Sequence, residues 1–152
     1  MDDIITTLFN GLTYGGDLKL SVLNYALLVI AMLPFLLPAV KSIAKRWGIV
    51  FIIAVLVQST FWFVLGVQGI SIIWNALAGM LMLVVVRHGT SLLKNAKWFV
   101  LASIAIVILG DVYFGLIFPL ITTIAHVAAF LLGVILYLLV GFRKDRSVSL
   151  SS

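Results

Sequence analysis

The sequence predicts an all-α polytopic membrane protein built as a bundle of about five transmembrane helices. Of its 152 residues 64% are hydrophobic and only 10% are charged, whereas about a quarter of an average soluble chain is charged. Apolar runs close to the ~20 residues that span a bilayer recur along the chain. The alternating pattern of a membrane barrel is absent. These three observations favour a helical membrane protein over a soluble domain.

The N-terminal segment, residues 1–19, is predicted to be an interfacial loop with a short helix. We expect Gly11, Gly15 and Gly16 to break any long helix there, because glycine adopts conformations that other residues avoid. Apolar side chains that can rest on the membrane surface are Ile4, Ile5, Leu8 and Phe9.

Five apolar runs then form the predicted transmembrane core, residues 20–142. The predicted spans cover residues 20–40, 48–66, 70–86, 98–119 and 121–142. Pro34 and Pro38 fall in the last turns of the first span. A polar tail, residues 143–152, follows the last span and is expected to be cytoplasmic.

The distribution of basic residues predicts the orientation. The 41–47 loop, the 87–97 loop and the C-terminal tail hold every Lys and Arg except Lys19. An odd number of spans places all three segments on one side, and cytoplasmic loops carry the excess of basic residues. The N-terminus is therefore expected outside and the C-terminus in the cytoplasm, in a multi-pass protein of the plasma membrane.

Polar residues from four different spans fall at one predicted depth. Asn24, Ser71 and His126 lie near the start of inward-going spans, and Asp111 lies near the end of an outward-going span. At ~1.5 Å per residue all four belong to the outer half of the membrane. Ionisable groups inside a membrane are costly and are candidates for function.

The third span carries a small and polar face. Ser71, Asn75 and Gly79 are spaced four residues apart, so they share one side of a helix. Such a face packs against protein rather than lipid. On this pattern alone Ser71 is either a helix cap or packing residue, or a nucleophile.

A nucleophilic serine needs a base and donors for the oxyanion. His126 is the candidate base, because His88 lies in a cytoplasmic loop on the opposite side. Candidate oxyanion donors are the Asn24 amide and backbone N–H groups at the start of the Ser71 helix. Structural alternatives remain: His126 and Asn24 can bond neighbouring helices, and for Asp111 a structural role is the favoured interpretation.

Other chemistries find less support in the composition. The chain has no cysteine, which excludes disulfides, thiolate catalysis and cysteine metal sites. Neither a metal, a cofactor nor a nucleic acid is implied. A small channel or a holin would need a polar stripe through the full depth of the membrane, but only Gln58 falls at mid-depth.

Two segments carry a resemblance to a known family. Gly69-Ile-Ser71 followed by Ala-Leu-Ala-Gly at 76–79 resembles the serine-bearing helix of rhomboid intramembrane proteases, whose motif is Gly-x-Ser-Gly. The stretch from Ala125-His126 to Ala129 and Gly133 is similar to that family's last core helix, Ala-His-x-x-Gly-x-x-x-Gly. Small residues there permit close approach of the two helices that carry Ser and His.

The chain also departs from the family pattern. Leu20, four residues before Asn24, stands where the family has a histidine that helps bind the oxyanion. Ile72 replaces the second glycine of Gly-x-Ser-Gly, and Ala129 replaces a glycine. The family's first core helix and the loop with its Trp-Arg pair have no counterpart. The chain thus resembles a five-helix version of a six-helix core.

The resemblance implies an intramembrane serine endopeptidase that cleaves transmembrane proteins near the outer membrane face. Ser71 would be the nucleophile, His126 the base, and Asn24 with the Ser71 N–H the oxyanion donors. A partner helix or a second copy could supply the missing helix. The alternative is a catalytically silent rhomboid-like protein that binds transmembrane clients.

Overall fold

The computed structural model describes residues 2–65, 69–90 and 92–141, and these residues form helices and turns without a strand. Five helices are long and apolar enough to cross a membrane. They are α2 (Leu18–Met32, continued by the 3-10 helix η2, Leu33–Leu36), α4 (Trp47–Leu65), α5 (Ser71–His88), α6 (Lys94–Ile117) and α7 (Leu120–Gly141). The predicted tail at 143–152 lies outside the described residues.

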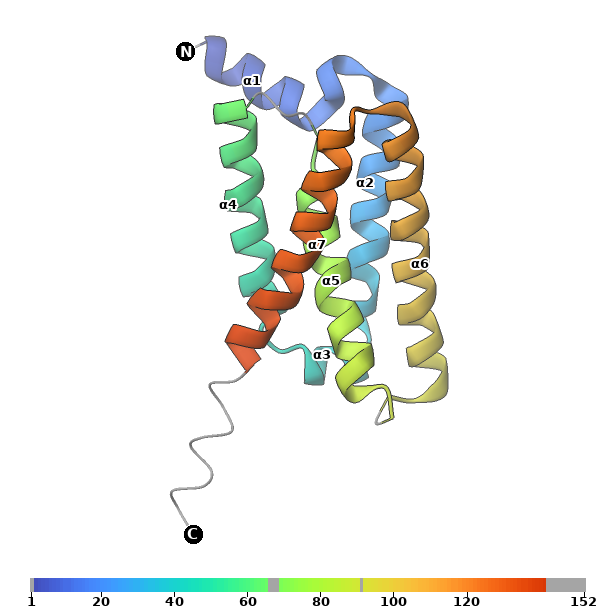
Figure 1. Cartoon of the computed structure of the whole chain (residues 1–152). Coiled ribbons are helices and arrows are strands. Elements are labelled where there is room, and N and C mark those ends of the chain that lie inside the picture. The colour runs from blue at the N-terminus through green and yellow to red at the C-terminus, as the bar shows by residue number, and fades with distance from the viewer. Residues whose placement is uncertain (1, 66–68, 91, 142–152) are drawn as a thin grey trace.

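Helix α5 is the centre of the bundle, and the other four long helices surround it (Figure 1). Within its apolar window 72% of the residues are buried, against 22% to 33% in the other four helices. Figure 1 also shows that α5 begins below the level at which α4 ends. The first turn of α5, which carries Ser71, therefore lies inside the bundle rather than at its rim.

The N-terminal segment is more helical than predicted. Helix α1 (Asp2–Thr13) runs through Gly11 and lies across one end of the bundle (Figure 1). The chain turns only after it, in the short 3-10 helix η1 (Tyr14–Gly16), where Gly15 has a φ of 66° and Gly16 a φ of 94°. Ile4, Ile5 and Phe9 are exposed on α1. Gly11 therefore does not break the helix, because a right-handed helix tolerates glycine at modest cost.

The first predicted span ends earlier than residue 40. Helix α2 continues through η2 to Leu36, and Leu37 is extended, with φ −69° and ψ 127°. A residue that precedes proline is driven out of the helical region, and Pro38 opens a separate short helix, α3 (Pro38–Ile43). The start of α2 is fixed by Asp17, whose side chain accepts a hydrogen bond from the Leu20 N–H at 3.0 Å.

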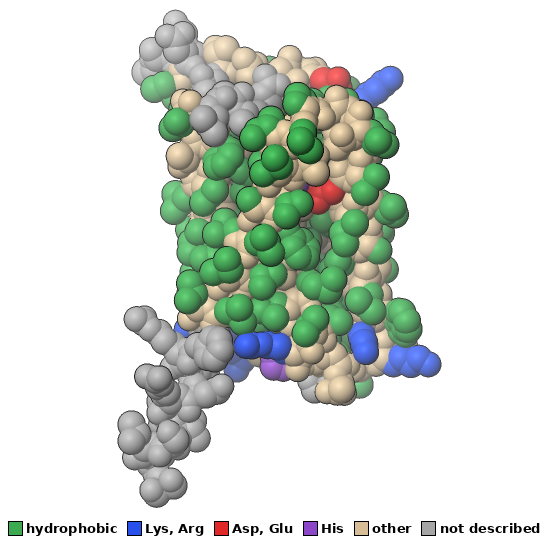
Figure 2. Space-filling model, viewed as in Figure 1, with side chains coloured by type: hydrophobic (Ala, Val, Ile, Leu, Met, Phe, Trp, Pro, Cys, Tyr) green, Lys and Arg blue, Asp and Glu red, His purple; other side chains and the backbone are tan. Residues whose placement is uncertain are grey.

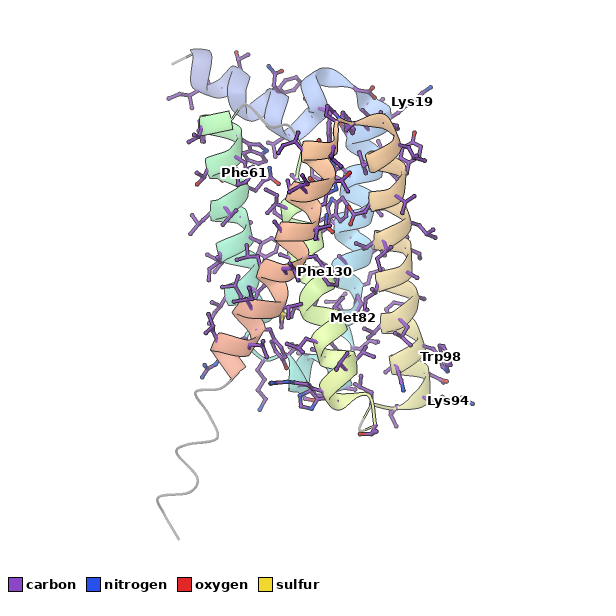
Figure 3. All side chains as sticks on the ribbon, in the orientation of Figure 1. Lys19, Phe61, Met82, Lys94, Trp98 and Phe130 are labelled. Carbon is purple, nitrogen blue, oxygen red and sulfur yellow. The ribbon has the colours of Figure 1, made fainter. Side chains whose placement is uncertain are left out.

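Charge and apolar surface are segregated along the bundle. Hydrophobic side chains cover the face of the bundle that Figure 2 shows, and most Lys and Arg side chains on it gather at the end opposite α1. Lys94 and Trp98 mark that end, whereas Lys19 lies at the α1 end (Figure 3). A band of apolar surface between two polar ends is what a bilayer requires of a helical bundle.

Helices α5 and α7 pack with their backbones in contact. A Cβ atom added to Gly79 would overlap the backbone carbonyl of Phe130, and one added to Gly133 would overlap the carbonyl of Ala76. Figure 3 shows Phe130 at mid-height on α7. The close approach predicted from the small residues is confirmed at both glycines.

Candidate active site

Ser71 is the first residue of α5, and side chains from α4 form hydrogen bonds with the backbone on both sides of it. The Trp62 indole N–H donates to the Gly69 carbonyl at 2.7 Å. The Ile72 N–H donates to the Gln58 side-chain oxygen at 3.0 Å, which satisfies one of the backbone N–H groups that a helix start leaves open. Gln58 is therefore at the level of the serine and not an isolated mid-membrane group. Its contact also occupies the N–H next to Ser71.

Ser71 and His126 line one cavity of 790 Å³, which α4 and α7 bound together with Tyr14 and Phe118. Both side chains are buried, with exposed fractions of 4% for Ser71 and 3% for His126. The rim includes the exposed residues Ile121 and Ile124, so the cavity reaches the surface of the bundle. Nearly all its other lining is apolar, including Val57, Phe61, Ala129 and Leu132.

The imidazole of His126 packs against two aromatic rings. Its centroid lies 5.5 Å from that of Trp74 and 6.3 Å from that of Phe114. Within the described residues its Nε2 has no hydrogen-bond partner, and none joins it to the Ser71 hydroxyl. A buried nitrogen without a partner is unusual in a structural histidine. It is the state that a base awaiting a proton requires, and base contacts are often unformed without substrate.

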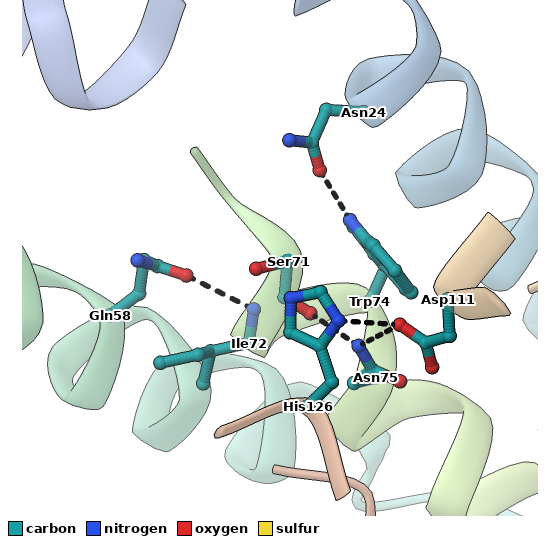
Figure 4. A network of polar contacts seen from close by, with 8 residues as sticks. All are labelled: Asn24, Gln58, Ser71, Ile72, Trp74, Asn75, Asp111 and His126. Atoms are coloured by element: carbon teal, nitrogen blue, oxygen red, sulfur yellow. Dashed lines mark hydrogen bonds and ion pairs between the residues drawn. The ribbon is translucent and has the colours of Figure 1, made fainter. Parts of the chain in front are cut away.

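Asp111 on α6 approaches the other ring nitrogen of His126. The distance from His126 Nδ1 to Asp111 Oδ1 is 2.7 Å, although the angles at Nδ1 fall short of a hydrogen bond. Asn75 Nδ2 donates to the same carboxylate oxygen at 3.0 Å and to the Ser71 carbonyl at 3.1 Å (Figure 4). One carboxylate thus links the serine-bearing helix to the histidine.

Asn24 on α2 is also part of this site. Its side-chain oxygen accepts a hydrogen bond from the Trp74 indole N–H at 2.6 Å, and its Nδ2 is buried without a partner among the described residues (Figure 4). Because the oxygen is occupied by Trp74, the amide orientation leaves the donor end available. The candidate oxyanion donor therefore has an unused N–H in this structure.

Tyr14 in η1 completes the site, and sequence analysis did not single it out. It lines the cavity together with Ser71, and its hydroxyl lies beside Gly69, two residues before Ser71. Burial raises the pKa of Tyr14 to about 12, against a smaller lowering by the contacts with Asn24 and Ser71. No motif marks this residue; its position depends on the turn η1, which joins α1 to α2.

The sequence-predicted residues thus divide by position. The structure brings together Asn24, Ser71, Asn75, Asp111 and His126, all at the α1 end of the bundle. Gly79 and Gly133 lie further along α5 and α7 as packing residues, while Ala129 is buried on the cavity wall. Gly69 has a φ of 92° and contacts the Tyr14 ring, so it shapes the approach to Ser71.

A second cavity of 490 Å³ lies between α6 and α7, and Asp111, Thr123 and His126 contribute to its lining. Among the described residues no group of three or more His, Cys, Asp or Glu could hold a metal ion.

No family model, no curated protein and no solved structure matches the chain.

Proposed function

We propose that the chain is a rhomboid-like intramembrane serine peptidase of the plasma membrane. Its N-terminus would lie outside the cell and its C-terminus in the cytoplasm. The observation that carries the proposal is the shared cavity: Ser71 and His126, from separate helices, both line it, and His126 Nε2 is unoccupied. The resemblance of the segments around these two residues to the rhomboid motifs supports the same assignment.

In the proposed reaction Ser71 Oγ attacks a substrate peptide carbonyl while His126 Nε2 accepts the serine proton. The histidine then delivers that proton to the leaving amine, the C–N bond breaks, and an ester to Ser71 remains. Water, deprotonated by His126, hydrolyses the ester and restores the serine. The unpaired Asn24 Nδ2 would donate to the oxyanion.

Asp111 extends the proposed Ser–His dyad. Its position 2.7 Å from His126 Nδ1 would favour the tautomer with the proton on Nδ1, leaving Nε2 as the acceptor. It would also stabilise the imidazolium that forms when Ser71 loses its proton. Asp111 is a positioning residue in this scheme, since it acts through His126.

The cavity suggests how a substrate would reach the serine. Its walls on α4 and α7 are apolar and include Val57, Phe61 and Leu132. An apolar transmembrane segment could approach between these two helices and place an unwound carbonyl near Ser71. The concentration of Lys and Arg at the opposite end supports an outward-facing site.

Labelling with a fluorophosphonate tests the proposal. Purified protein in detergent should react, and Ser71→Ala and His126→Ala should each lower the labelling rate at least about 10³-fold. Ser103→Ala is the matched control: Ser103 is also buried, but its hydroxyl bonds the Ile30 carbonyl at 2.8 Å, away from the site. This variant should label like the wild type. Folded wild-type protein that does not label would overturn the peptidase.

The second candidate is a catalytically silent rhomboid-like protein that holds transmembrane clients. Two observations favour it: the apolar cavity suits a client helix, and Gln58 already occupies the Ile72 N–H beside the serine. This candidate expects no labelling, together with photocrosslinking of a model transmembrane peptide from Phe61 that Ser71→Ala leaves unchanged.

A further inference from the structure

The site has one side-chain oxyanion donor fewer than the family that the chain resembles. In the family that the chain resembles, a histidine four residues before the asparagine helps bind the oxyanion, but this chain has Leu20 there. A leucine side chain cannot donate a hydrogen bond. The neighbouring Ile72 N–H is occupied by Gln58. Among Asn24, Leu20 and the Ile72 N–H, only Asn24 would be available to donate to the negative charge that develops on the substrate carbonyl oxygen.

Tyr14 brings a hydroxyl to the same place from another element. Its ring stacks on Phe114 and Phe118, with centroid distances of 6.0 Å and 5.9 Å. Its hydroxyl lies beside Gly69, two residues before Ser71, and close enough to the Asn24 and Ser71 side chains for both to lower its pKa. The two stacking partners fix the ring plane, so the hydroxyl is directed to the cavity that holds Ser71 and His126.

Two backbone features serve this placement. Tyr14 itself has a φ of 50°, the single positive φ of a non-glycine residue in the described chain, and side chains other than glycine rarely adopt this conformation. At Gly69 an added Cβ would overlap the ring and hydroxyl of Tyr14. The unusual backbone conformation of Tyr14 and the lack of a Cβ at Gly69 together allow the phenol to lie against the turn that leads into Ser71.

The phenol is a hydrogen-bond donor under ordinary conditions. Burial raises its pKa to about 12, and the charge of Asp111 acts in the same direction. The neutral hydroxyl therefore persists well above neutral pH. A neutral, preoriented donor in a buried site is the kind of group that stabilises an oxyanion.

We infer that the Tyr14 hydroxyl is an oxyanion donor of this site and supplies the hydrogen bond that Leu20 cannot. The inference rests on the proposed peptidase function. In the resting protein the hydroxyl lies beside the turn that leads into Ser71; when the carbonyl oxygen becomes negative, the hydroxyl and Asn24 Nδ2 would both donate to it.

The test compares second-order rates of fluorophosphonate labelling, because the phosphonyl oxygen occupies the oxyanion position. Tyr14→Phe keeps the ring and removes the hydroxyl, and should lower the rate about 10²-fold. Tyr137→Phe is the matched control: Tyr137 is a buried tyrosine whose hydroxyl faces the Ile43 carbonyl at 3.4 Å. Its rate should stay at the wild-type value.

The outcomes separate the two proposals. Wild-type protein that does not label removes the peptidase and this inference with it. Wild-type labelling with an equal rate for Tyr14→Phe overturns the inference alone. A slower Tyr14→Phe with an unchanged melting temperature supports it.

Where Tyr14→Phe also melts earlier, 3-fluorotyrosine at position 14 decides. This residue keeps the fold contacts but ionises at lower pH. Asp111 and His126, the ionisable groups beside the phenol, are the same in both proteins. A donor role shifts the alkaline loss of labelling to lower pH, whereas coincident pH profiles overturn the inference.

Discussion

The interface between α5 and α7 has two halves that differ in how well they are satisfied. From Ala76 onward the helices meet backbone to backbone, through Gly79 and Gly133, with no space for a Cβ. Toward the start of α5 the same two helices line a cavity of 790 Å³ together with α4. In and beside it, buried nitrogen atoms of His126 and of Asn24 on α2 lack partners among the described residues.

This difference indicates a division of labour. Tight packing of small residues holds two helices in register without any polar group. Unpaired buried polar atoms lower stability, and such violations of otherwise consistent packing are expected at functional sites. The packed half therefore positions the open half, and each can be disturbed separately.

The largest effect should follow from adding a methyl group to the tightly packed half of the α5–α7 interface. Gly133→Ala forces its Cβ into the Ala76 carbonyl, and should lower the free energy of unfolding by about 3 kcal/mol, since overpacked cores lose this much. Thermal melting in detergent measures it. Gly48→Ala is the control, because nothing lies within 4 Å of a Cβ there. Equal melting temperatures for the two variants would contradict the packing account.

Next in size is the loss of the carboxylate in the open half. Asp111→Asn should lower the fluorophosphonate labelling rate about 10²-fold, because an amide can hold His126 in the wrong tautomer. Its side chain is 25% exposed, so melting should change little. Asp17→Asn makes the same chemical change at the cap of α2 and should label normally. A wild-type rate for Asp111→Asn would leave the carboxylate without a role.

The smallest effect should come from loss of the hydrogen bond between Gln58 on α4 and the Ile72 N–H at the start of α5. Gln58→Leu removes the acceptor of the buried Ile72 N–H and should lower the free energy of unfolding by about 1 kcal/mol. The loss is partly offset because an unpaired Gln58 Nε2 disappears as well. Thr60→Val, on the exposed side of the same helix, should leave melting unchanged. An equal loss in both variants would show that the cap contributes nothing.

The five apolar helices follow from the sequence because each is specified locally. Four predicted spans agree with α4 to α7 within about four residues at each end, since hydropathy marks a span without reference to its neighbours. The two errors are also local: Gly11 was given too much weight as a helix breaker, and Pro38 too little. Leu37, extended before that proline, ends the first span.

The layer of polar residues was likewise predicted, because depth can be counted along a helix. Asn24, Ser71, Asp111 and His126 were expected at one level, and they lie in one cluster. Which of them touch depends on rotation about each helix axis, and only packing sets that. The carboxylate of Asp111 was predicted to be structural; that it faces His126 Nδ1 emerges from the contact of α6 with α7.

What the sequence alone determined, then, is the set of helices, their small-residue faces and the common level of Asn24, Ser71, Asp111 and His126 along the bundle. Tertiary structure alone decided the partners: Gln58 on the Ile72 N–H, Trp74 on Asn24, and Tyr14 against Gly69. The physical reason is range. Hydropathy and helical spacing act over a few turns, whereas a side chain's partner is chosen by how five helices pack around α5.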